Sequence, residues 1–365
     1  MDRMFPLGLP APTAFYLVLY LVTLAVHVAF MNYVLAGTAY LAAVTIFPGG
    51  PLRRDRGRVA SLLRDWMPAS LSAAITAGVA PLLFVQVLYH DSFYTANLLL
   101  FHRWMAVLPA LIVGFYLLYL LKEKEVGAWP LVPRVLVGAG PIACFAFTGY
   151  SWTENHLLGM KQALWPAHYA SGSMISAGGE ILPRLSIWFT GAVPTLALLV
   201  AWQLWQVAGS ASCPTSGKPR RLAEAALLGL IASIGSSGWY FAAMEPSERA
   251  VLTGALAAPY LWMAIAGLVV QIIAWGVQWR RPSFGSSGLV LASAGWLATV
   301  LGVSVLREAV RLNALDPAKL ESIHARAALS GGFVVFLIFA AVNLVLITWC
   351  VLLVRRGVRE AEASQ

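Results

Sequence analysis

The stretch that decides the fold is residues 14–46, which read AFYLVLYLVTLAVHVAFMNYVLAGTAYLAAVTI. The stretch contains no Asp, Glu, Lys or Arg. An apolar run longer than about 18 residues is typical of a helix that crosses a lipid bilayer. A strand of a membrane β-barrel would instead show about 10 residues of alternating polarity. Residues 14–46 therefore predict a membrane-spanning helix.

Similar apolar runs recur along the chain. Of its 365 residues, 59% are hydrophobic and 11% are charged, against roughly 25% charged in a soluble domain. The predicted spans are 14–46, 69–89, 98–121, 132–150, 184–207, 222–243, 251–279, 287–306 and 330–354. The sequence thus predicts an all-α fold, a polytopic transmembrane helix bundle of about nine spans. We expect one membrane domain that covers residues 1–365.

The basic residues predict the orientation. Most of the 25 Lys and Arg residues lie in the segments that share a side with the C-terminus. Because basic loops stay in the cytoplasm, we expect the N-terminus outside and the C-terminus inside, in a bacterial-type cytoplasmic (inner) membrane. The net charge of +9 then reflects these loops, so we expect the lipid bilayer as a partner and no nucleic acid.

One ionisable residue lies well inside the first predicted span. His27 is surrounded by apolar residues in LAVHVAF. A polar ionisable group at that depth is costly unless it is paired, so a function is one reading. As a neutral imidazole, His27 could ligate haem iron. The other reading is a structural imidazole that donates to a backbone carbonyl of a neighbouring helix.

Ionisable residues also gather where other spans end. Glu308 and Arg311 end the eighth predicted span at i, i+3 spacing, which favours an ion pair on one helix face. Glu245 ends the sixth span, where a carboxylate could accept quinol protons or face water. Three further histidines lie in predicted outer loops and carry little signal (His156, His168 and His324). No HExxH motif or paired-cysteine spacing indicates a zinc site or a c-type haem.

Two further residues, taken alone, are explained by helix packing or by their place at the membrane interface. Met263 lies in the seventh span, where a lone methionine is usually a packing residue. His102 begins the third span, close to the membrane interface, where histidines are common surface residues. Neither residue predicts a binding site without further information.

Several stretches, taken in order, resemble subunit I of the cytochrome bd quinol oxidases. The first span, with His27 and Gly37, is similar to the opening helix of that family, whose histidine ligates a high-spin haem. Gly78-Val79-Ala80 followed by Gln86 resembles its GVxTG…EFxxGTNW stretch.

The resemblance continues into the second half of the chain. Ala242-Ala243-Met244-Glu245 is similar to the end of that family's sixth helix, which precedes its quinol-binding loop. Met263 falls where the family has a methionine ligand to its low-spin haem. Glu308 with Arg311 resembles the ExGRQPW segment, whose glutamate ligates the second high-spin haem.

The resemblance implies a cofactor and a set of binding residues. His27 would ligate haem iron, and Glu308 would be a ligand or a proton acceptor. Arg311 would balance the charge of a haem propionate or of Glu308. His102 could supply a substitute ligand near the outer face. Ile187 stands about where the family has a histidine ligand to the low-spin haem, so we expect haem b or a related haem in a smaller number than in that family.

The sequence leaves two principal functions open. The first is a haem-binding subunit of a respiratory electron-transfer complex, an oxidoreductase subunit that passes electrons at the outer face and reduces oxygen or a similar small molecule. Its partners would be other membrane or periplasmic redox subunits, such as a c-type cytochrome. The alternative is a haem-free membrane scaffold that anchors redox partners, which Ile187 supports. A transporter is less favoured, since no internal repeat or broken helix is visible.

Overall fold

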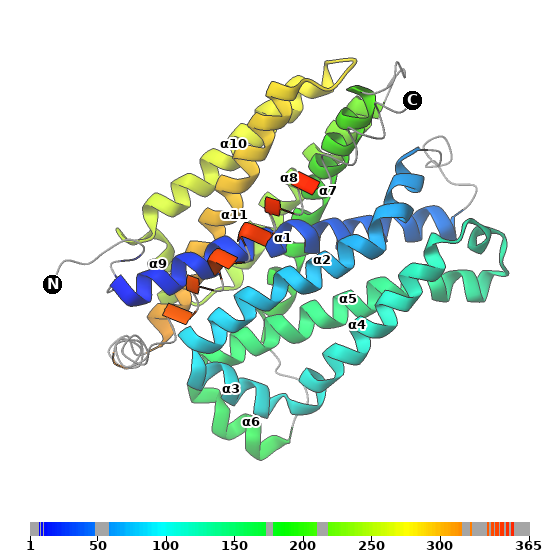
Figure 1. The fold of residues 1–365 in the computed structure, drawn as a ribbon. Helices are drawn as coiled ribbons and strands as arrows, with labels where there is room; N and C mark the ends of the chain where they lie inside the picture. The colour runs from blue at the N-terminus through cyan, green and yellow to red at the C-terminus, as the bar shows by residue number, and fades with distance from the viewer. Residues whose placement is uncertain are drawn as a thin grey trace.

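The computed structural model describes residues 11–47, 58–172, 178–209 and 218–315, together with a few isolated positions outside these ranges. The described chain is a bundle of long helices, and Figure 1 shows how they run alongside one another. No β-strand occurs among the described residues. The predicted fold class, an all-α polytopic helix bundle, is confirmed.

The long helices correspond to the predicted spans. They are α1 (Ala11–Ile46), α2 (Arg58–Leu88), α4 (Phe101–Lys122), α5 (Leu131–Met160), α7 (Ile181–Gly209), α8 (Lys218–Ala243), α10 (Ala258–Trp279) and α11 (Ser286–Ala314). Eight helices within the described residues are long and apolar enough to cross a bilayer. The chain is therefore a multi-pass membrane protein. The predicted span 330–354 lies outside the described residues, apart from scattered helical positions.

Short helices connect some of the long ones at their ends. These are α3 (His90–Leu99), α6 (Trp165–Ser171) and α9 (Pro246–Thr253), with 3-10 turns at Lys124–Ala128 and Gln162–Leu164. Figure 1 places α3, α6 and α9 towards one end of the bundle, where α1 begins and α11 ends. We call this the polar end, because buried charged side chains gather there.

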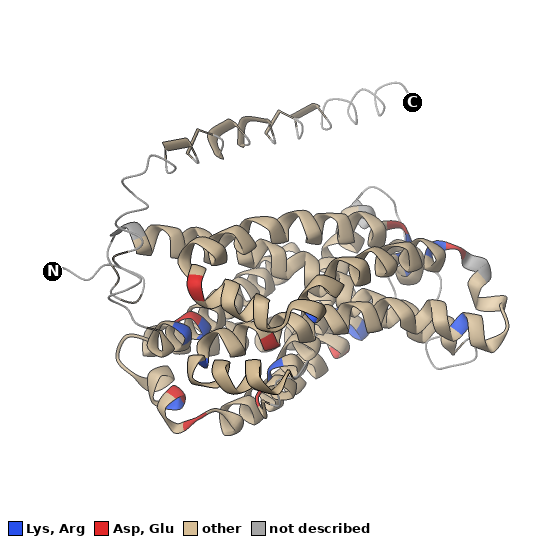
Figure 2. Cartoon of the chain, turned by 90° about the horizontal axis from the view of Figure 1, so that it is seen from below, with Lys and Arg blue, Asp and Glu red and all other residues tan. Residues whose placement is uncertain are grey.

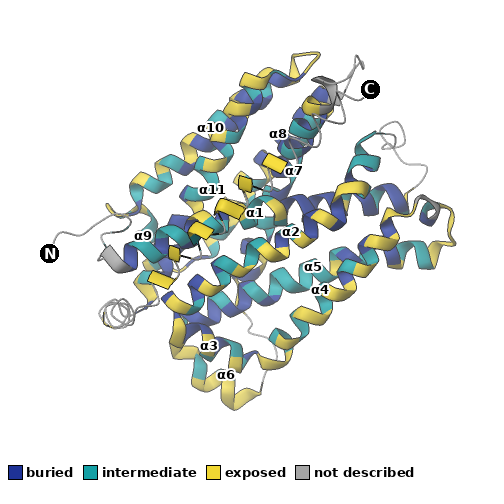
Figure 3. Cartoon of the chain, in the orientation of Figure 1, coloured by how far each residue is buried: buried dark blue, intermediate teal, exposed yellow. Residues whose placement is uncertain are grey.

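Packing centres on α1, which contacts α2, α5, α7 and α11. The other extensive helix pairs are α4 with α5, α7 with α8, and α10 with α11. The outer faces of the helices carry large exposed apolar side chains, such as Leu108, Tyr116 and Trp262, each about two-thirds exposed. Figure 3 shows these exposed stripes, and Figure 2 shows that most of the ribbon carries no charged residue. Such surfaces are suited to lipid, since water would disfavour so large an apolar area.

Three helix ends at the polar end differ from the predicted boundaries. The eighth predicted span ends at residue 306, yet α11 continues to Ala314. The fourth predicted span ends at residue 150, yet α5 continues to Met160. The seventh begins at residue 251, yet Thr253 ends α9 and Ala258 begins α10. Hydropathy missed the last turns of α5 because they carry Thr153, Glu154 and Asn155. These three side chains are buried inside the bundle instead of facing lipid or water.

The crossing of α10 and α11 depends on two glycines. A Cβ atom on Gly267 would lie 2.6 Å from the carbonyl oxygen of Gly295 and 2.7 Å from the backbone nitrogen of Thr299. Backbone atoms cannot move aside as a flexible side chain can. Small residues at such crossings allow helix backbones in membranes to approach closely.

We expect Gly267→Ala to destabilise the protein by about 1–3 kcal/mol, because the added methyl group forces α10 and α11 apart. Gly276→Ala is the matched control, since Gly276 lies on the same helix and a Cβ there meets no atom within 4 Å. Unfolding of the purified variants in detergent measures the difference. Equal stability of the two variants would contradict the close crossing.

Candidate functional site

His27 lies on α1 against α2. Its Nδ1 atom is 2.9 Å from the carbonyl oxygen of Ala74. A carbonyl oxygen can only accept, so this contact assigns the proton to Nδ1 and leaves the Nε2 lone pair unprotonated. No described residue forms a hydrogen bond with Nε2. A ligating histidine commonly donates its other N–H to a carbonyl in this way, so the geometry fits both sequence readings of His27.

Gly78 makes room for the imidazole. A Cβ atom at position 78 would lie 2.9 Å from Cε1 and 3.0 Å from Nδ1 of His27. Gly78 and Ala74 are one helical turn apart on α2, so one provides space for the ring while the other accepts its proton. The first and second helices therefore hold His27 in a defined orientation.

Glu308 on α11 is fully buried and both of its carboxylate oxygens are engaged. Nε of Arg307 donates to Oε1 at 3.0 Å. The Tyr89 hydroxyl donates to Oε2 at 2.8 Å. Nη1 of Arg311 lies 3.2 Å from Oε2, which is the ion pair that the i, i+3 spacing predicts. In this arrangement Glu308 is the charge partner of two arginines, and each of its carboxylate oxygens accepts a hydrogen bond.

The arginines extend this network to other helices. Arg307 donates to the Tyr20 hydroxyl of α1, and Arg311 donates to Nδ1 of His156 on α5. The guanidinium of Arg311 also lies over the Tyr89 ring, with Cζ 4.4 Å from the ring centroid. We call this group the polar cluster: Tyr20, Tyr89, His156, Arg307, Glu308 and Arg311. It joins α1, α5, α11 and the junction between α2 and α3.

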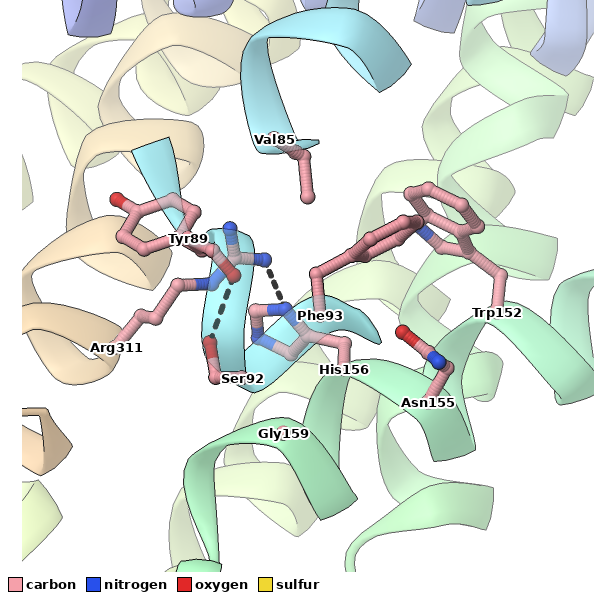
Figure 4. A pocket seen from close by; sticks show the side chains of 9 residues that line it. All are labelled: Val85, Tyr89, Ser92, Phe93, Trp152, Asn155, His156, Gly159 and Arg311. Carbon is pink, nitrogen blue, oxygen red and sulfur yellow. Dashed lines mark hydrogen bonds between the residues drawn. The ribbon is translucent and has the colours of Figure 1, made fainter. Parts of the chain in front are cut away.

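Three members of the polar cluster, Tyr89, His156 and Arg311, help to line a small pocket, shown in Figure 4. The side chains point into it from the α2–α3 junction, from α5 and from α11. Its cavity of about 20 Å³ offers room for about one water molecule or an ion of similar size. The lining residues are Val85, Tyr89, Ser92, Phe93, Trp152, Asn155, His156, Gly159 and Arg311.

A third buried arginine lies near the polar cluster. Arg184 on α7 is 6% exposed. Its guanidinium lies over the Tyr240 ring, with Cζ 5.6 Å from the centroid. It interacts electrostatically with Arg307 and Arg311, but its Nη1 atom has no hydrogen-bond partner among the described residues. The region thus holds more buried positive than negative charge.

A separate ion-pair group lies where α5, α7 and α9 meet. Nζ of Lys161 is 2.5 Å from Glu180 and 3.2 Å from Glu245. Burial favours a lower pKa for Lys161, but hydrogen bonds to Glu180 and Glu245 outweigh it and raise the pKa. Glu245 also begins α9 with a reciprocal capping box that includes Glu248. These contacts give Glu245 a structural role at the helix start.

The other residues singled out in the sequence lie apart from the polar cluster. His102 is exposed on α4, with its ring centroid 5.5 Å from that of Phe101. Met263 is half-buried on α10, and Ile187 is half-buried on α7. His324 lies outside the described residues. Among the described residues, no group of three or more His, Cys, Asp or Glu side chains could hold a metal ion.

A comparison of the chain with protein-family models, with curated proteins and with solved structures finds no match. The resemblance to the cytochrome bd quinol oxidases therefore rests on the sequence motifs alone.

Sequence reasoning missed two central residues. His156 was assigned to an outer loop, although Ser151 to Leu158 contains no Gly or Pro that would end a helix. Arg184 is the first residue of the predicted span 184–207. A lone arginine in an apolar segment is a functional candidate by default, so both residues could have been found from the sequence. Their proximity to Arg311 could not.

Proposed function

We propose that this chain is a haem-binding integral membrane subunit of a respiratory electron-transfer complex. The observation that carries the proposal is His27, whose Nδ1 atom is bonded to the Ala74 carbonyl oxygen at 2.9 Å and whose Nε2 atom has no partner among the described residues. That is the protonation state in which an imidazole could ligate haem iron. The sequence resemblance to the bd oxidases supports the same assignment.

In this proposal His27 would hold the haem iron through Nε2. Bound haem would supply one-electron transfer, with its potential tuned by ligand and surroundings. The Ala74 carbonyl keeps Nδ1 protonated and increases the basicity of Nε2. Gly78 keeps the ring position free of a side chain. The residues of α1 and α2 therefore fit one axial ligand.

The polar cluster supports a different role for Glu308. An iron ligand needs a free carboxylate oxygen, whereas Glu308 accepts from Tyr89 and Arg307 and pairs with Arg311. Glu308 is better suited to neutralise the two arginines and to accept the hydrogen bond that orients the Tyr89 hydroxyl. We infer that the haem complement is small, and that redox partners at the polar end, such as a c-type cytochrome, deliver the electrons.

We expect Gly78→Ala to weaken haem binding at least about tenfold. The added methyl group would lie 2.9 Å from Cε1 of His27, so the imidazole must leave its position. Gly238→Ala on α8 is the control, because a Cβ there meets no atom within 4 Å. Titration of the apoprotein with haem, followed by absorbance, compares the two variants. Equal haem affinity would show that Gly78 does not position the ligand.

The alternative is a haem-free membrane scaffold for redox subunits. It is favoured by the polar cluster itself, which links α11 to the other helices through side-chain hydrogen bonds within the protein. A pyridine haemochrome assay on the purified protein distinguishes the two functions. A haem signal with a reduced-minus-oxidised α-band supports the first, and protein without iron supports the scaffold.

A further inference from the structure

The pocket at the polar end is lined by hydrogen-bond donors that have no acceptor. Nδ1 of His156 accepts from Arg311, so the ring proton must be on Nε2 when the imidazole is neutral. That Nε2 atom is buried and has no hydrogen-bond partner among the described residues. The Nη1 atom of Arg311 likewise makes no hydrogen bond, although it lies near Glu308.

The charge around the pocket is positive and only partly balanced. Arg184 interacts electrostatically with Arg307 and with Arg311, and all three arginines act on His156. Glu308 is the carboxylate paired with Arg307 and Arg311. Glu180 acts on Arg184, but its nearest cation is Lys161, at 2.5 Å. A buried charge without a partner is strongly unfavourable, so an additional negative charge here would stabilise the fold.

We propose that this pocket binds a small monovalent anion, such as formate or chloride, between His156 and Arg311 with Arg184 nearby. Nε2–H of His156 and Nη1 of Arg311 would donate to it, and Arg184 would contribute charge. The cavity of about 20 Å³ suits a small ion of one to a few atoms better than a bulky one. The site does not depend on haem.

The test measures the thermal unfolding of the full-length protein in detergent at constant ionic strength. The reference buffer contains only 2-morpholinoethanesulfonate, an anion too large for the cavity. We expect formate or chloride to raise Tm saturably, by at least about 3 °C. A rise in Tm with formate alone would indicate a site for oxyanions, and a rise with chloride alone would indicate a site for halides. A rise that does not saturate, or no rise, would overturn the proposal.

Two variants locate the effect. Arg184→Gln removes a charge whose Nη1 atom has no hydrogen-bond partner among the described residues. We therefore expect Tm in the reference buffer to be unchanged or higher and the response to the anion to fall at least about fivefold. His156→Leu removes the unpaired donor and should also weaken the response. Arg220→Gln is the matched control, since its side chain is 61% exposed and paired with Glu224. An undiminished response in both the Arg184→Gln and the His156→Leu variant would exclude this site.

Discussion

Purified His27→Ala protein is expected to contain no haem, or less than about a tenth of the haem in the unaltered protein. The imidazole is the ligand that the geometry of α1 and α2 supports, and alanine leaves the iron without it. The pyridine haemochrome assay measures haem per protein, and the reduced-minus-oxidised spectrum shows whether an α-band remains. The fold should persist, because His27 makes one side-chain hydrogen bond in the described structure.

His102→Ala is the control for this experiment. His102 is exposed on α4, and we expect its removal to leave the haem content unchanged. Haem loss in His102→Ala with retention in His27→Ala would move the ligand to the surface of α4 and refute the assignment to His27. If both variants had the same haem content and the same spectrum, another residue would have to be the ligand. If the unaltered protein contained no iron, the scaffold function would be favoured.

The second large effect is expected from Glu308→Gln. Glu308 is fully buried between Arg307 and Arg311. Glutamine keeps the size of the side chain but removes the negative charge, so both guanidinium groups lose their carboxylate. Breaking a buried ion pair in this way typically destabilises a protein by about 3–5 kcal/mol. Chemical unfolding of the variant in detergent measures the loss.

Glu224→Gln provides the comparison for Glu308→Gln. Glu224 also pairs with an arginine, Arg220, but its side chain is 45% exposed. An exposed ion pair contributes about 0–1 kcal/mol, so this variant should retain nearly full stability. If the two variants were equally stable, Glu308 would not be the buried carboxylate that neutralises Arg307 and Arg311. The result is independent of haem, because the contacts of Glu308 lie within the chain.

The apolar composition was sufficient to predict the helices, since hydrocarbon leaves a backbone few other ways to satisfy its hydrogen bonds. The same reasoning fails where polar residues continue a helix, as in Glu154 and His156 on α5. These residues reduce the hydropathy, yet they face other helices and never meet lipid. The Glu308–Arg311 pair was predictable because both residues lie on one helix at a fixed spacing.

Residues 14–46 already determine that the chain enters a membrane as a helix, and they place one histidine deep within it. The sequence could not decide what His27 contacts, because the Ala74 carbonyl and Gly78 belong to another helix. It also could not bring Tyr20, His156 and Glu308 together, since these residues are separated by more than a hundred positions along the chain. Those contacts depend on how the helices pack, and only the tertiary structure sets that packing.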